Sequence, residues 1–194
     1  MDGGRRLRWR GVTGGLAALL LLMANAPGHA QGQPDDGILT FQFDNDMFGN
    51  TDQHFTHGTR LAWMAPEDHV PDWVTYGAAF VPLFDATASK RIVYSLGQSI
   101  YTPDDISVKT LVPDDRPYAG WLYVGIGLVS VSGDQLDNLE LDLGVVGPHS
   151  YAEDVQKTWH GWFGFQRPQG WDNQLRDEPG ILLTYERKWR RWAR

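Results

Sequence analysis

Several common features are missing from this chain, and each absence excludes a class of protein. The 194 residues include no cysteine, so disulfides cannot stabilise the fold. No apolar run approaches the roughly twenty residues of a membrane-spanning helix. The G-x-S-x-G sequence of many serine hydrolases is absent, and so is the H-x-x-x-H spacing of many zinc sites. Stability must therefore come from an apolar core, a metal or a membrane.

The first thirty residues have the pattern of a cleaved export signal. Four arginines between positions 5 and 10 precede the apolar segment Leu16–Met23, and Ala30 is a small residue suited to cleavage. A membrane anchor is the rival interpretation, but this apolar segment is too short to cross a bilayer. We therefore expect a signal peptide over residues 1–30 and a mature protein that begins at Gln31.

The charge of the chain excludes some partners. Removing residues 1–30 changes the net charge from −7 to −10, because 13 basic and 23 acidic residues remain. Nucleic acid is not an expected partner, since phosphate binding requires a clustered basic face. Contact with an anionic surface would require a divalent cation between the two negative charges.

Apolar residues alternate with polar or small ones along most of the chain, which indicates β-strands. The connections are rich in proline, glycine and aspartate, so residues 66–71, 103–117 and 148–171 are expected to be loops. Val155–Phe163 within the last of these is a candidate short helix. The six expected strands are Ile38–Phe43, Thr59–Met64, Ile92–Tyr101, Tyr123–Val129, Leu139–Val145 and Ile181–Trp189.

Alternation alone fits either a soluble β-sandwich or a membrane β-barrel. Aromatic residues near the strand ends favour the barrel, because they resemble the interfacial girdles of outer-membrane proteins. Six strands are fewer than the eight or so of the smallest membrane barrels, so we expect the N-terminal part of a larger barrel or a truncated product. The girdle candidates are Trp63, Trp73, Tyr101, Tyr118, Trp121, Tyr123, Trp159, Trp162, Tyr185 and Trp189.

Oxygen-bearing side chains gather after the first expected strand, in Asp44-Asn45-Asp46. Such a cluster suits Ca²⁺, although an EF-hand is excluded because Phe48 and Phe55 occupy positions that require oxygen ligands. The alternative is a strand-end turn held by the aspartate and asparagine side chains.

Two other segments are candidate sites. Gln156 and His160 are four residues apart, so on a helix the amide would orient the imidazole and His160 would act as a general base. The alternative is a polar histidine among tryptophans at a membrane interface. Asp115–Trp121 combines an arginine beside an acid with a Pro-Tyr-Ala-Gly turn, and the favoured interpretation is a turn at the lip of a barrel.

These motifs, in this order, resemble the lipid A 3′-O-deacylase (LpxR-like) family from about Ile38 to Trp189. No single motif is specific, but their combination is. The matching segments are Phe43–Phe48, Asp52, Phe55–Gly58, Gln98–Pro103, Asp114–Gly120, Gly144–Pro148, Gln156 with His160, Gly170–Asp172 and Asp177–Gly180.

The resemblance implies a twelve-stranded outer-membrane β-barrel that uses Ca²⁺ to hydrolyse the 3′-linked acyloxyacyl ester of lipid A. His160 would be the base that activates water, and Asn45, Asp46 and Thr56 would complete the catalytic set. Lys109 is the candidate substrate-binding lysine. The implied metal ligands are Asp46 and the position of a family glutamate, which is Gln166 in this chain.

The resemblance also implies a monomer in the bacterial outer membrane whose partner is lipopolysaccharide. Two alternatives stay open, because neither strand pattern nor aromatic girdles require catalysis. One is a non-catalytic outer-membrane barrel with a binding or structural role. The other is a soluble periplasmic β-protein.

Overall fold

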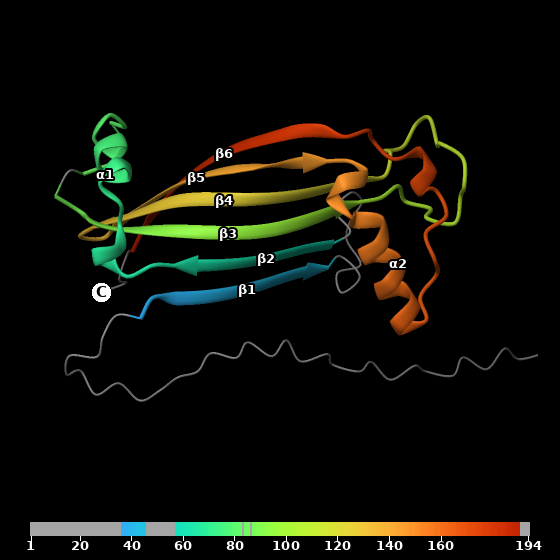
Figure 1. Ribbon diagram of the computed structural model, residues 1–194, viewed down its shortest axis with the longest axis horizontal. Helices are drawn as coiled ribbons and strands as arrows, with labels where there is room; N and C mark the ends of the chain where they lie inside the picture. Colours follow the sequence, from blue (N-terminus) through green and yellow to red (C-terminus); the bar gives the residue numbers. More distant parts are fainter. Residues whose placement is uncertain (1–35, 46–56, 83, 86, 191–194) are drawn as a thin grey trace, which may run out of the picture. The chain divides into compact units, whose positions relative to one another are not determined.

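The fold is a single antiparallel sheet with short helices near both ends of its strands (Figure 1). In this computed structural model, the described residues are 36–45, 57–82, 84–85 and 87–190. All six predicted strands are confirmed, each of them longer than predicted, and they pair in chain order. They are β1 (Ile38–Asn45), β2 (His57–Met64), β3 (Ser89–Tyr101), β4 (Ala119–Ser132), β5 (Gln135–Val146) and β6 (Glu178–Trp189).

Helical segments occupy part of the regions that were predicted to be loops, and a further helix over residues 72–79 was not predicted. Near one end of the strands lie η2 (Glu67–His69) and α1 (Asp72–Ala79); near the other lie η3 (Pro148–Ser150), α2 (Ala152–Phe163) and η4 (Trp171–Asn173). The predicted helix is confirmed as α2, but it begins three residues earlier. No helix in the described part of the chain has the length and apolar character needed to cross a membrane.

The left-handed backbone of Tyr151 explains why α2 starts where it does. With φ 57°, this residue redirects the chain from η3 into α2, and Gly164 ends the helix with φ 68°. Few residues other than glycine adopt this conformation, so the turn at Tyr151 leaves little trace in the sequence. Glu153 and Asp154 in the first turn interact favourably with the helix dipole.

The register of the strands gives the sheet one polar and one apolar face. The polar face carries Arg60, Asn138, Glu140 and Asp142, whereas the opposite face carries a band of exposed apolar side chains. A cavity of about 190 Å³ on the polar face is lined by residues from β1 through β5, so the sheet is concave on this side. The apolar band on the outer face includes Leu39, Phe41, Leu61, Leu96, Val124, Leu143, Ile181 and Leu183.

An ion pair on the concave face joins two strands that are not neighbours. Arg60 on β2 lies 2.5 Å from a carboxylate oxygen of Glu140 on β5, and Ser95 donates a hydrogen bond of 2.9 Å to the same oxygen. In a flat sheet these strands would be roughly 14 Å apart, since neighbours are spaced by about 4.8 Å. Gly125 provides the room between them, because a Cβ there would lie 2.1 Å from Ser95 Oγ.

The aromatic girdle is confirmed only in part. Trp63, Tyr185 and Trp189 are exposed on the apolar face, as predicted. Trp121 and Tyr123, in contrast, stack with a centroid distance of 4.4 Å on the concave face, where Tyr123 covers Gly97. The pattern of aromatics near strand ends does not reveal which face each ring occupies.

A small core holds the α2 end of the molecule against the apolar face. It consists of Ile100, Tyr118, Ala152 and Trp171, and all four are almost fully buried. Tyr118 is therefore a core residue, and its predicted place in the girdle was wrong. Gly120 is needed for this packing, because a Cβ at this position would lie 2.1 Å from Ser150 Oγ.

Candidate functional site

His160 has one ring nitrogen available for chemistry. It lies in the last turn of α2 and is partly exposed, and its Nδ1 is 2.5 Å from the backbone carbonyl oxygen of Gln166. A carbonyl only accepts hydrogen bonds, so Nδ1 must carry the proton in this contact. The lone pair of the neutral ring then resides on Nε2, which is the state required of a general base.

Gln156 does not orient this imidazole, contrary to the prediction. Its side chain is 3% exposed, and its Oε1 accepts a hydrogen bond of 2.8 Å from the indole Nε1 of Trp171. The reason is its place on the buried stripe of α2, four residues after Ala152, which directs the amide into the core. Within the described residues, the partner that orients His160 is the Gln166 backbone.

Trp159 joins the ends of β1 and β2 to the helix that carries His160. Its ring lies 5.4 Å from that of Phe43 and 6.1 Å from that of His57, measured between centroids. His57 pairs in register with Asn45, so the predicted catalytic position on β1 reaches the same end of the molecule as α2. Of the other predicted site residues, Asp46 and Thr56 lie outside the described residues.

Asp44, the first residue of the predicted oxygen cluster, lies near the end of β1. Asp44 lies on the concave face, where its Oδ2 accepts a hydrogen bond of 2.6 Å from Gln42 Nε2. His57, Phe43 and α2 lie on the opposite face, so Asp44 is turned away from His160. The described part of the chain contains no group of three acidic, histidine or cysteine side chains suited to a metal. The predicted Ca²⁺ ligands Asp46 and Gln166 stay a prediction.

The loop between β3 and β4 brings Lys109 beside η4. Lys109 is exposed, and its backbone oxygen accepts a hydrogen bond of 2.6 Å from Asn173 Nδ2. In the same loop, the Asp115 carboxylate accepts hydrogen bonds from the backbone N–H groups of Asp104 and Arg116. These contacts support the structural interpretation of the Asp115 turn, whereas the role of Lys109 in binding substrate stays a prediction.

Sequence reasoning did not identify the contact of Phe43 and His57 with Trp159. The sequence contained the information needed to predict this contact. Strand alternation places Phe43 and His57 on the apolar face, and Trp159 immediately precedes His160 in the chain. Aromatic rings on an apolar strand face pack readily against a helix. This contact is what brings the strand ends and the proposed base together.

A comparison with protein families matches residues 16–194 to the family described as outer membrane protein LpxR. The chain belongs to this family. Among solved structures, LpxR from Salmonella typhimurium is similar in fold, with a TM-score of 0.52 and 21% sequence identity. The similarity covers 67% of this chain and 38% of that structure, so the chain spans well under half of its length. No curated protein matches the sequence.

Membership of the LpxR family and the structural similarity confirm the predicted fold class. The antiparallel strands, the polar concave face and the apolar outer face are those of a barrel wall. In the described residues the sheet is open, with β1 and β6 at its two edges. The LpxR family is one of outer membrane proteins, whereas the signal peptide falls outside the described residues and stays a prediction, as does the monomeric state.

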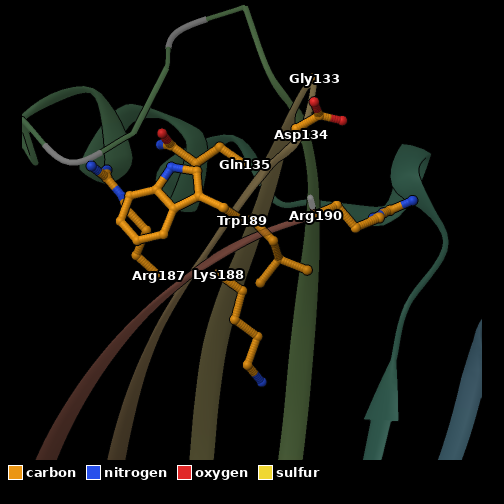
Figure 2. Close-up of a pocket in the computed structure, with 8 residues that line it drawn as sticks. Gly133, Asp134, Gln135, Arg187, Lys188, Trp189 and Arg190 are labelled. Atoms are coloured by element: carbon orange, nitrogen blue, oxygen red, sulfur yellow. The ribbon is translucent and has the colours of Figure 1, made fainter. Parts of the chain in front are cut away.

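A second cavity in this LpxR-family chain lies at the other end of the strands from α2. It has a volume of about 1020 Å³ and lies beside the β4–β5 hairpin and the end of β6 (Figure 2). None of the predicted site residues lines it. Two of its cations already have acidic partners, since Arg187 pairs with Asp137 and Lys188 pairs with Glu186. Because no predicted site residue lies at this cavity, the candidate site remains at α2.

Two hydrogen bonds connect the chain segments on the two sides of α2 in this LpxR-family protein. Asp177, just before β6, accepts hydrogen bonds from the backbone N–H of His149 at 2.9 Å and from its ring Nδ1 at 2.6 Å. These two bonds, the backbone bond first, hold the pKa of Asp177 below its ordinary value. A lowered pKa means that the charged carboxylate stabilises the folded connection and that protonation removes this contribution.

We expect Asp177→Asn to increase hydrogen exchange at the His149 amide at neutral pH. The contribution of the charged carboxylate is fully present above the ordinary aspartate pKa of about 3.9. It is lost as the pH falls through the lowered pKa of the folded state, so the difference between variant and wild type should vanish at still lower pH. Exchange measured residue by residue across this range checks the prediction. A difference that persists unchanged at the acidic end would contradict it.

Proposed function

We propose that this chain carries the catalytic base of an outer-membrane esterase that removes the 3′-linked acyloxyacyl chain of lipid A. The observation that best supports this proposal is the hydrogen bond between His160 Nδ1 and the Gln166 carbonyl oxygen. This bond leaves Nε2 as a base on the apolar side of a membrane-barrel wall. Family membership supports the choice of substrate. An ester at the boundary between sugar and acyl chains would meet a base at the end of lipid-facing strands.

In the proposed reaction, Nε2 of His160 removes a proton from water, and the water oxygen attacks the ester carbonyl. The resulting imidazolium keeps its Nδ1–H bond to the Gln166 carbonyl, which disperses the new positive charge. When the tetrahedral intermediate collapses, the bond to the 3′-oxygen breaks and Nε2 returns the proton to that oxygen. The products are a free fatty acid and a 3′-hydroxyl group.

Asn45, Asp46 and Thr56 complete the proposed site from the strand ends, and Lys109 binds the substrate. Their support is the register that brings Asn45 opposite His57, close to α2. The described residues alone do not form a Ca²⁺ ligand set, because they offer Gln166 but not Asp46. Bound Ca²⁺ would supply positive charge beside the ester carbonyl and reduce the repulsion between an acidic protein and a phosphorylated glycolipid.

The test is mass spectrometry of lipid A from cells that express the chain. We expect a loss of mass equal to the 3′-linked acyloxyacyl group when Ca²⁺ is present, and unchanged lipid A after chelation with EGTA. Restoring Ca²⁺, but not Mg²⁺, should restore the reaction, because a flexible oxygen site favours the larger ion. Unchanged lipid A despite confirmed membrane insertion and added Ca²⁺ would contradict the proposal and favour a non-catalytic barrel.

A further inference from the structure

Helix α2 has a stripe of exposed apolar side chains that no described part of the protein covers. Tyr151 at its N-cap, Val155 and Trp162 are 57%, 38% and 76% exposed. Val155 and Trp162 are seven residues apart, which places them on one side of the helix, and Tyr151 is exposed where the helix begins. Phe163 and Phe165, which are also exposed, extend this apolar surface beyond the end of the helix. We refer to Tyr151, Val155 and Trp162 as the apolar stripe.

A second side of α2 faces the sheet. Ala152 and Gln156 are buried there, and Trp159 contacts Phe43 and His57. Both of these strand residues belong to the outer, apolar face of the sheet. The helix is therefore mounted on the outside of the barrel wall, and not within its polar concavity.

The third side of α2 is polar. Glu153 and Lys157 form an ion pair one turn apart, and Asp154 is exposed near them. A helix with one apolar side that carries a tryptophan, here Trp162, and one charged side is typical of segments that lie in a membrane interface. The stripe is adjacent to the apolar band of the outer face, which indicates that both contact the same bilayer.

We propose that α2 is an interfacial membrane helix whose apolar stripe inserts into the lipid leaflet beside the barrel wall. The occupant of this surface is bilayer lipid, because the stripe continues the lipid-facing side of the sheet and carries no charge. Insertion fixes the depth of the helix, and His160 on α2 is thereby held at the level where acyl chains join the headgroup. The consequence for catalysis rests on the proposed function, whereas insertion itself does not.

The absence of cysteine makes a direct test of depth possible. Trp162→Cys and Lys157→Cys each create a unique thiol on the full-length chain, which can carry a bimane fluorophore in phosphatidylcholine vesicles. Dibrominated acyl chains should quench the label at position 162 at least twofold more strongly than the label at 157. Aqueous iodide should show the reverse order. Equal quenching at both positions, or iodide access at position 162, would overturn the proposal and would favour a protein partner for the stripe.

A second readout separates insertion from catalysis. Trp162→Ser and Val155→Ser should reduce hydrolysis of lipid A in vesicles by about tenfold and leave the rate in detergent micelles unchanged, because micelles present the substrate without a fixed depth. Equal rates for variants and wild type in vesicles would overturn the role in positioning. If the wild type were inactive everywhere, the proposed function would fail, but the quenching measurement would still decide whether α2 inserts.

Discussion

Replacing His160 with alanine is expected to lower the rate of lipid A hydrolysis by about 10²–10⁴-fold, the usual contribution of a positioned general base. The effect should appear in the rate of the chemical step, because the Nε2 lone pair that would accept the proton from water is lost. Stability should change little, since the ring makes one described hydrogen bond, to the Gln166 backbone, and is partly exposed. The measurement is single-turnover kinetics, with the enzyme in excess over lipid A and with saturating Ca²⁺.

His69→Ala is a matched control for this experiment. His69 is exposed in η2, at the opposite end of the strands from α2, so its removal should leave hydrolysis unchanged. Equal rates for His160→Ala and wild type, with both proteins inserted, would remove His160 from the mechanism. Equal losses in the two histidine variants would indicate a general effect on folding.

Replacing Trp171 with alanine is expected to destabilise the α2 end of the molecule by about 3–5 kcal/mol, as for other buried large-to-small changes. Trp171 is 1% exposed, and its ring lies 4.8 Å from that of Tyr118 between centroids. Its loss would leave a cavity against Ile100 and Ala152 and would remove the hydrogen-bond partner of the buried Gln156. Proteolytic susceptibility of residues 147–177 under native conditions measures the change.

Two further variants separate packing from hydrogen bonding at Trp171. Trp171→Phe keeps an aromatic ring but leaves the Gln156 carbonyl unpaired, so it should cost about 1–3 kcal/mol. Trp73→Ala is the control, because Trp73 is 65% exposed on α1 and its removal should change stability by no more than about 0.5 kcal/mol. If Trp171→Ala were no more sensitive to protease than Trp73→Ala, the small core would not be what holds α2 in place.

The sequence predicted the sheet well because each strand has two different environments. A polar concavity on one side and an apolar outer face on the other produce clean alternation, as in β5, and that pattern is visible without any structure. The helix was less visible, since α2 faces core, solvent and an apolar exposed side in turn. Three environments around one short helix give no simple two-sided pattern, so within residues 148–171 only Val155–Phe163 was predicted to be helical and the start of α2 was missed.

The sequence predicted the features of the candidate site that depend on residue identity, but not those that depend on backbone groups or on strand orientation. His160 on a helix is confirmed, but its orienting partner is the backbone carbonyl of Gln166, and a backbone group leaves no signature in residue identity. The Asp44-Asn45 pair was predicted as one cluster, whereas strand alternation turns Asp44 to the concave face. The alternation of a strand decides which face each residue occupies, so membership of a cluster in the sequence does not place Asp44 on the same face as α2.

The ion pair between Arg60 and Glu140 has a consequence for the order in which the protein folds. Every strand pairing joins neighbours in the chain, so the sheet can form one hairpin at a time from contacts of modest sequence separation. The two ionic partners are eighty residues apart and meet only after β2 through β5 have assembled and curved. A fluorescence probe of the distance between these two residues would therefore report the late folding step in which the fully paired sheet becomes curved.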